Sequence, residues 1–538
     1  MMVTDKSRPA GPANLPSARL PAASAAAPPA RQVPASSVPD RFFSLAPLAL
    51  LALATLLAMY LFPVGSALAD AAGHSADLAA DHGGGHGADS LHLDGASLAI
   101  WWVIPFVGML LSIALFPLIA PHFWEHNFGK VALFWAAAFF VPAVALLGGA
   151  LSFYSLVHTV VAEYIPFIIL LLALFAIAGG IRVKGSLSGT PAMNLAFLVI
   201  GSVLASVMGT TGASMLLIRP YIAASAHRRY RVHTIVFFIF LVSNIGGSLT
   251  PLGDPPLFLG FLKGVTFFWT TTHIWVQTVC MEIALLAIHY VVDSYLYKKE
   301  GSPTVPATEK IGLEGSINFL LLAAVVGLVL LSGLWHSQGQ LVVWKDITYL
   351  FSDITRDAGL LILTFLTVFI TPKATREGNN FTWGPIKEVA KIFFGIFITM
   401  IPAIAILRAG VEGELASLIS LVSTATGDPV NMAYFFLTGA LSSFLDNAPT
   451  YLVFFNTAAG SATDAAAFMM NQIPQTLAAI SCGAVFMGAN SYIGNAPNFL
   501  VRSIAEERGV KMPSFFGYLL WSVGILGPLF IVLAFVFF

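Results

Sequence analysis

Two polar clusters, each with one aspartate, interrupt long apolar runs in separate halves of this 538-residue chain. The first cluster begins at Ser243 and ends in Gly-Asp-Pro-Pro, where the acid is Asp254; the second is Leu-Asp-Asn-Ala-Pro-Thr around Asp446. Lys, Arg and His are absent from both clusters. A charged group at membrane depth costs about 2.5–3.5 kcal/mol even on permissive scales and is usually functional. We therefore expect the two aspartates to hold a proton or, transiently, a metal cation such as sodium.

Each half has a second interruption near the first, over residues 209–214 and residues 488–498. Paired interruptions at corresponding places in two halves are typical of secondary transporters whose binding site is made by discontinuous helices. The side chains in the breaks are oxygen-bearing and suit a small hard cation or the edges of an organic acid. Besides the two aspartates, the predicted binding residues are Ser243, Asn244, Ser248, Thr250, Asn447, Thr450, Asn490, Ser491, Asn495 and Asn498. The competing interpretation makes Asp254 a turn residue and Asp446 a helix N-cap.

The composition restricts the class of protein. Hydrophobic residues make up 57% of the chain and charged residues only 10%, and the mean hydropathy is +0.83. Apolar stretches long enough to cross a bilayer recur along the sequence, which predicts an all-α polytopic membrane protein with lipid as its surroundings. The net charge of −1 gives no electrostatic footprint for nucleic acid.

The N-terminal region has a different composition from the rest. Residues 1–41 are rich in Pro, Ala and Ser and are expected to be disordered. The apolar stretch 42–69 is a signal peptide or a first membrane helix. Residues 70–95 carry repeated His and Asp with a run of glycines, and we expect a flexible periplasmic segment there rather than a metal site.

Basic residues predict the topology, because they concentrate on the cytoplasmic side. Segment 191–226 has basic residues near both ends and is predicted as a re-entrant hairpin, and segment 412–457 is predicted as its counterpart from the outside. Residues 96–298 and 316–538 then form two inverted-topology repeats, each with a re-entrant helical hairpin and a discontinuous transmembrane helix. The expected location is the cell inner membrane, with the 299–315 linker cytoplasmic and the His-rich segment and C-terminus periplasmic.

The string Ser-Asn-Ile-Gly-Gly-Ser-Leu-Thr-Pro-Leu-Gly-Asp-Pro-Pro from Ser243, together with Leu-Asp-Asn-Ala-Pro-Thr from Leu445, resembles the ion transporter superfamily. The likeness within it is to NhaD-type sodium/proton antiporters and the citrate-transporter-like proteins grouped with them, over roughly residues 96–538. It implies a homodimeric carrier with a scaffold part and a mobile part that moves like an elevator. It also implies that Thr210, Thr211 and Ser214 join the binding residues at the first hairpin tip.

Two differences from the sequences of related carriers restrict the range of expected substrates. Arsenite carriers have an Asn-Asp pair where this chain has the neutral Thr210-Thr211-Gly212-Ala213, and the Ser-Asn-Thr triplets of dicarboxylate carriers are absent from both tips. Exchange of sodium or lithium for protons by alternating access is the expected function, and sodium- or proton-coupled transport of citrate or another organic anion is the alternative. No cofactor is expected beyond the transported ions. An enzyme is not expected, because the aspartates lack the sequence contexts of diaspartyl intramembrane proteases.

Overall fold

The computed structural model describes residues 93–185, 188–303, 312–335, 339–345, 347–424 and 426–538. The predictions for residues 1–41, 42–69 and nearly all of 70–95 fall outside the described residues.

The first half is helical apart from one short strand. Its elements are η1 (Gly95–Ser97), η2 (Ile100–Val103), α3 (Ile104–Ile119), α4 (Pro121–Leu146), α5 (Gly149–Thr159), the π-helical turn η3 (Val160–Tyr164), α6 (Ile165–Ala178), β1 (Arg182–Lys184), α7 (Pro191–Met208), α8 (Thr210–Ala224), α9 (Val232–Leu241), η4 (Ile245–Leu249), α10 (Pro255–Leu262), α11 (Trp269–His273) and α12 (Trp275–Lys299). Several helices begin with proline in their first turn, where its fixed φ suits the helix and its missing N–H costs nothing.

The second half adds three short strands to a similar set of helices. Its elements are β2 (Gly312–Glu314), α13 (Ile317–Leu334), β3 (Gln340–Trp344), β4 (Ile347–Leu350), α14 (Phe351–Ile370), α15 (Lys373–Gly378), α16 (Gly384–Arg408), η5 (Gly410–Glu412), α17 (Ala416–Val422), α18 (Asn431–Phe444), α19 (Asn447–Ala459), α20 (Ala465–Asn471), α21 (Pro474–Met487), η6 (Gly488–Asn490), α22 (Ala496–Glu507) and α23 (Phe515–Phe537).

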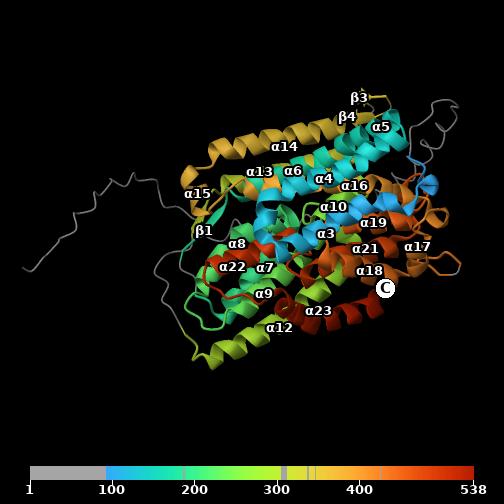
Figure 1. Cartoon of the computed structure of the whole chain (residues 1–538). Coiled ribbons are helices and arrows are strands. Elements are labelled where there is room, and N and C mark those ends of the chain that lie inside the picture. The colour runs from blue at the N-terminus through green and yellow to red at the C-terminus, as the bar shows by residue number, and fades with distance from the viewer. Residues whose placement is uncertain (1–92, 186–187, 304–311, 336–338, 346, 425) are drawn as a thin grey trace, which may run out of the picture. The chain divides into compact units, whose positions relative to one another are not determined.

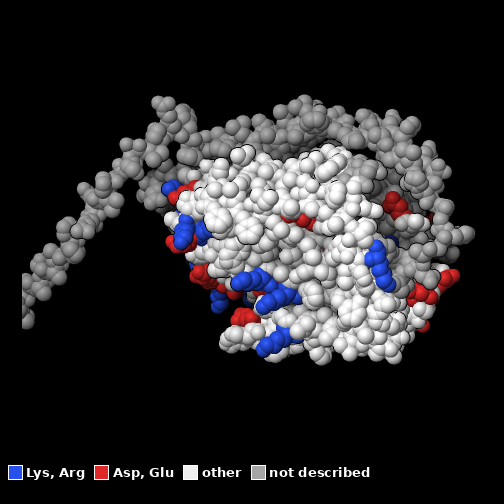
Figure 2. Space-filling model, turned by 90° about the horizontal axis from the view of Figure 1, so that it is seen from above, with Lys and Arg blue, Asp and Glu red and all other residues white. Residues whose placement is uncertain are grey.

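Within the described residues, nine helical stretches are long and apolar enough to cross a membrane. The face shown in Figure 2 is largely uncharged, and its charged side chains gather mainly toward the left and lower left, with a smaller group at the right. Large apolar side chains remain exposed on this protein, among them Phe134, Phe369 and Leu520. A soluble protein does not leave so much apolar surface in water, so these helices need lipid around them. The prediction of an all-α polytopic membrane protein is confirmed.

Both predicted hairpins are present as pairs of helices. In the first, α7 and α8 meet at Gly209, whose φ of 82° is a conformation that glycine adopts without strain. In the second, α18 and α19 meet at Leu445 and Asp446. This hairpin begins at Asn431, later than the residue 412 expected from the sequence, because a proline-containing loop separates it from α17. The opposite directions of entry into the membrane stay a prediction.

Each hairpin is followed by a helix with a break. The first broken helix consists of α9, the 3₁₀ turn η4 and α10; the second consists of α21, η6 and α22. The two halves interlock at these elements, since α10 packs on α19 and α22 packs on α8 (Figure 1). An antiparallel pairing of β1 with β2, with Arg182 opposite Glu314, also joins the halves.

A buried group of charges fixes the base of the first hairpin. The sequence predicts cytoplasmic charge at His227–Arg231, but the Arg228 side chain is fully buried in the structure. Its Nη1 donates to Asp293 Oδ1 at 2.6 Å and its Nε to Glu300 Oε1 at 2.6 Å. His233 Nε2 contacts the same Asp293 oxygen at 2.8 Å. Because a buried charge is tolerated only with partners, this group ties the loop after α8 to α12.

Candidate functional site

The carboxylate of Asp254 lies at the centre of a buried polar network. Asp254 is 1% exposed. Its Oδ1 accepts hydrogen bonds from Thr210 Oγ1 at 2.8 Å and from Asn495 Nδ2 at 3.1 Å. Its Oδ2 accepts a hydrogen bond from Asn447 Nδ2. The donors belong to both hairpins and to the second break, so one side chain collects residues from all four interrupted segments.

The same pattern of hydrogen bonds stabilises each break. In the first, the Thr250 hydroxyl donates to the carbonyl of Ser206 and accepts from the Leu252 N–H at 3.2 Å. In the second, the Ser491 hydroxyl donates to the carbonyl of Ser443 at 2.5 Å and accepts from the Ile493 N–H at 3.2 Å. A hydroxyl therefore replaces the missing helical partner in each break, as turn-forming Ser and Thr do.

Close backbone contacts also match between the breaks. A Cβ on Gly253 would lie 2.1 Å from the carbonyl oxygen of Gly247, and a Cβ on Gly494 would lie 2.5 Å from that of Gly488. Only glycine leaves room for such an approach. The residues that follow these glycines are Asp254 and Asn495, which stand 241 positions apart and are hydrogen-bonded to each other. The corresponding positions of the two breaks thus meet, one as an acid and the other as an amide.

Four helix N-termini converge on the same place. Helices α8, α10, α19 and α22 begin at Thr210, Pro255, Asn447 and Ala496, at or next to residues that bond to the Asp254 carboxylate or bear it. A helix N-terminus carries roughly half a positive charge. Because no basic residue accompanies these acids in the sequence, the sequence predicts that their charge lacks compensation. The convergent helix ends supply that compensation, which a list of residue types does not reveal.

Asp446 has a different role in the structure from Asp254. It is half-buried, and its Oδ1 accepts a hydrogen bond from the Ala448 N–H at 3.1 Å as the N-cap of α19. Its carbonyl accepts from the Thr450 hydroxyl at 3.0 Å. Among the described residues no hydrogen bond joins the two carboxyl groups; Asp254 bonds instead to Asn447, the neighbour of Asp446. The structure thus brings the two acids into one region but gives them separate partners.

The asparagines extend the network around Asp254. Asn495 Nδ2 also approaches the Ser243 carbonyl at 3.1 Å and Asn244 Oδ1 at 3.2 Å. Asn244 Nδ2 donates to Asn498 Oδ1 at 2.7 Å. Asn498 Nδ2 donates in turn to two carbonyls of the second break, and the Ser243 hydroxyl contacts that of Ser214 at 2.9 Å. These predicted residues form one continuous chain across the two halves.

Other predicted residues lie at the edge of this network. Ser248 contacts Thr278 of α12 at 2.8 Å, and Asn490 Nδ2 donates to the Ser443 hydroxyl at 2.9 Å. Thr211 is half-buried in α8 beside Thr210. Ser206 and Ser443 were not among the predicted residues, although their carbonyls anchor both breaks. Ser202, Ser206 and Thr210 recur every four residues in an apolar segment, which was the available signal.

One acceptor in the site has no donor. Asn447 Oδ1 is buried and lacks a hydrogen-bond partner within the part of the chain that the structure describes. A buried unpaired oxygen is costly, and it marks a place where a proton-bearing group or a cation would be stabilised. Asp254 and Asn447 are therefore the oxygen ligands best placed for a small hard cation.

Known proteins resemble the chain over nearly all of its described length. The model of a family described as putative citrate transport matches residues 95–538. Uncharacterized transporters of Mycobacterium bovis and Mycobacterium tuberculosis are each 26% identical over 421 residues, which cover 74% of this chain and 85% of theirs.

Proposed function

Because the chain belongs to the family of putative citrate transport, and is therefore a membrane transporter and not an enzyme, we propose that it exchanges sodium or lithium for protons at Asp254. The observation that carries this proposal is a single buried carboxylate surrounded only by neutral donors: Thr210, Asn447 and Asn495. Such a group can take a proton or a bare cation, and both neutralise its charge. Two states of equal charge are what an alternating carrier needs to cross the membrane loaded in either direction.

The chain's own residues can switch between the two loads. In the structure the Asn447 amide donates its N–H to Asp254 and leaves its Oδ1 without a donor. When the carboxyl is protonated, a turn of this amide presents Oδ1 to the new O–H. When a sodium ion is bound, the same turn makes Oδ1 a second ligand beside the carboxylate. Asn447 is thus the proposed adaptor between load states, while Thr210 and Asn495 keep Asp254 oriented.

Proton flux in proteoliposomes tests this proposal. Purified protein is given an inward sodium, lithium or potassium gradient, and the internal pH is followed with a dye. We expect alkalinisation of the vesicle interior driven by sodium and lithium but not by potassium, because each entering cation is exchanged for a leaving proton, and its loss in Asp254→Asn. Asn431→Asp, at the start of α18 and remote from the network, is a control that adds an acid and keeps the flux. Equal rates in the parent and Asp254→Asn would overturn the proposal.

An organic-anion carrier is the second candidate, and two observations favour it. The matching family is described by citrate transport. Four helix N-termini also point at the site, and such termini bind carboxylates. Asp254 would then serve the coupling ion. Uptake of labelled citrate that collapses with the ion gradient, in a protein that shows no sodium-driven proton flux, would establish this function in place of the first.

The remaining predictions complete the proposed picture. We propose an inner-membrane homodimer with alternating access. The Lys298 and Lys299 end of α12 would face the cytoplasm, and the C-terminus the periplasm. Cysteine labelling with an impermeant reagent in whole cells measures this orientation.

A further inference from the structure

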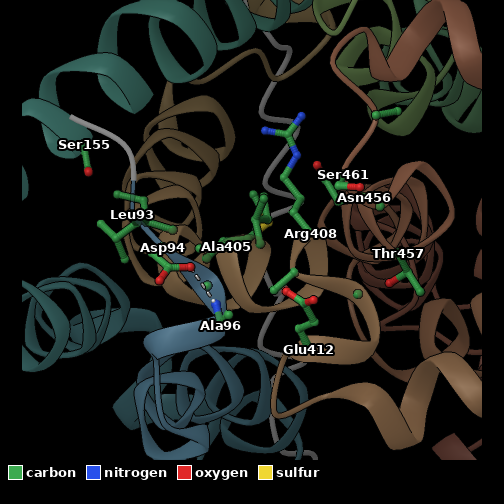
Figure 3. Close-up of a pocket in the computed structure, with 18 of the residues that line it drawn as sticks. Leu93, Asp94, Ala96, Ser155, Ala405, Arg408, Glu412, Asn456, Thr457 and Ser461 are labelled. Atoms are coloured by element: carbon green, nitrogen blue, oxygen red, sulfur yellow. Dashed lines mark hydrogen bonds between the residues drawn. The ribbon is translucent and has the colours of Figure 1, made fainter. Parts of the chain in front are cut away.

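A large cavity lies on one side of the site. Its volume is about 920 Å³. It is lined by η1, α5, η3 and the end of α16 on one wall and by the ends of α10 and α19 on the other. Figure 3 shows Arg408 extending into it, with Asn456, Thr457 and Ser461 on the opposite wall. The space is far larger than a hydrated monovalent cation needs.

Two helices lead from the binding network to this cavity. Helix α10 begins next to Asp254 and ends at Leu262, and its C-cap Lys263 lines the cavity. Helix α19 begins at Asn447 and brings Asn456 and Thr457 to the same wall, and the two helices pack on each other. The eight residues of α10 span roughly 12 Å. The cavity therefore lies about the length of one short helix from the Asp254 carboxylate. The two helices that line it at their C-terminal ends, α10 and α19, have Asp254 and Asn447 at their N-terminal ends.

An ion pair connects the two walls of the cavity. Lys263 Nζ lies 2.6 Å from Glu163 Oε1, and their side chains are 27% and 13% exposed. Glu163 sits in the π-helical turn η3, and such turns are rare and frequently functional. Lys263 is the C-cap of α10, where a cation also meets the negative end of the helix. The pair thus fastens the broken helix that carries Asp254 to the wall formed by α5 and η3.

The charge of the lining suits a cation. Three carboxylates line the cavity, from Asp94, Glu163 and Glu412, against the two cations of Lys263 and Arg408 and the imidazole of His158. The carbonyl ends of α10 and α19 add negative character on the inner wall. A concave surface of this sign raises the local concentration of cations.

We propose that this cavity is the access vestibule for the transported cation and that Glu163–Lys263 is its gate, which must open for the ion to pass between α10, α19 and the opposite wall. The inference rests on the proposed exchange at Asp254, since a vestibule needs a site to serve. Loss of either charge frees the end of α10 and exposes the inner wall. Reversal of both charges restores the attraction between the two side chains, but it places the acid at the negative end of α10, so it restores the closed state only in part.

Labelling of a cysteine in the vestibule wall tests the gate in the full chain. Thr457 is only 6% exposed and donates only to a carbonyl of its own helix, so Thr457→Cys is a small change. It is placed in a Cys280→Ser background, which removes the exposed native cysteine; Cys482 is buried and stays. Reaction with an impermeant maleimide is then timed in proteoliposomes, alongside sodium-driven proton flux.

We expect Glu163→Gln and Lys263→Met each to raise the labelling rate about threefold or more, as a shift toward the open state. Lys263→Arg should label at the parent rate, and the exchanged pair Glu163→Lys with Lys263→Glu should label more slowly than either single variant, although faster than the parent because its acid meets the negative end of α10. The control is Glu506→Gln, which breaks an exposed ion pair with Arg502 on α22 and should change nothing.

The outcomes separate the gate from the transported ion. The gate proposal would be overturned if Glu163→Gln and Lys263→Met both labelled at the parent rate. It would also be overturned if the exchanged pair labelled as fast as these single variants. Labelling that responds as expected in a protein without sodium-driven proton flux supports the gate and instead overturns the assignment of sodium as the substrate.

Discussion

The two breaks share their construction and differ in the residue that ends each of them. Thr250 and Ser491 make matching hydrogen bonds, and Gly253 and Gly494 make matching backbone approaches. The next residue is Asp254 in one break and an asparagine in the other. Because the backbone device is common to both, it shapes the site, while the single acid gives the site its charge. The scaffold is thus repeated and the chemistry is not.

The two hairpin tips differ in the residue that precedes the second arm, but the first residue of that arm makes the same contact in both. The residue before the second arm is Gly209 in the first hairpin and Asp446 in the second. Yet the first residue of each arm, Thr210 or Asn447, donates to the same carboxylate. Asp446 therefore occupies the capping position that Gly209 holds in the first hairpin. Its carboxylate accordingly accepts from a backbone N–H of its own helix, α19.

The largest expected effect comes from moving the acid between the matching positions. Asp254→Asn should lower sodium-driven proton flux by about a hundredfold or more, because the buried carboxylate that we propose as the ion ligand is lost. Asp254→Asn combined with Asn495→Asp returns one carboxylate to the same network and should recover the flux to within about tenfold of the parent. A double variant as inactive as the single one would show that the two positions are not interchangeable.

The glycines should respond similarly in both halves. Gly253→Ala and Gly494→Ala each place a Cβ against a carbonyl oxygen, at 2.1 and 2.5 Å. We expect each to destabilise the protein by about 1–3 kcal/mol, with the first substitution the worse. Gly327→Ala, in α13 with open space around it, is the control and should leave the thermal unfolding temperature in detergent unchanged or raised. A harmless Gly494→Ala would mean that the second break is not built on the close approach.

Removal of the second acid should cost less. Asp446→Ala deletes the cap of α19 and is expected to lower stability by about 0.5–2 kcal/mol, whereas Asp446→Asn keeps a capping oxygen and should be near the parent. Flux in Asp446→Asn should stay within about tenfold of the parent, in contrast with Asp254→Asn. If Asp446→Asn abolished the flux, both acids would be essential, as the sequence alone suggests. Thermal unfolding and proton flux on the same preparations separate the two effects.

The smallest effect concerns the strands that join the halves. The hydrogen bond from Lys184, with the positive charges of Lys184 and Arg182, lowers the pKa of Glu314 from its ordinary 4.5. A lowered pKa stabilises the fold above the ordinary value, and this contribution is lost as the pH falls through the lowered one. Glu314→Gln should therefore lower stability by less than about 1 kcal/mol near neutral pH. The difference from the parent should vanish in acid, and a constant difference across the range would rule out the ion pair as its cause.

Patterns along the chain predict the fold well because they report local physics. Apolar runs mark the helices, and Gly, Pro and Asn mark the hairpin tip at Gly209 and the break that ends at Asp254. The start of the second hairpin was misplaced, since α17 is as apolar as a hairpin arm. Periodicity does not tell whether an apolar segment turns back before it crosses.

The sequence predicts which residues form the site, but not which group each residue binds or whether it acts as a ligand or a cap. The sequence predicts Asn495 as an oxygen ligand, but in the structure its side-chain N–H group donates to Asp254. The two aspartates were treated as a pair because both interrupt apolar runs, yet spacing along the chain cannot tell a cap from a ligand. Convergence of four helix ends is a property of packing between halves, and no local pattern carries it.

The burial of Arg228 has a consequence for biosynthesis. A basic residue in a loop helps to fix orientation while the chain is being inserted, and in the folded protein this one is sealed between Asp293 and Glu300. In the proposed orientation, the same side chain would act first as a topological signal and later as a buried ion-pair partner. Both acids lie more than sixty residues downstream of Arg228, on or just beyond α12, whereas the Gly189 carbonyl, to which Arg228 Nη1 also donates at 3.1 Å, lies upstream, just before α7. The contact with Gly189 can join the two arms of the first hairpin early, but the two ion pairs of Arg228 can form only after α12 is synthesised, which places them late in the assembly of the first half.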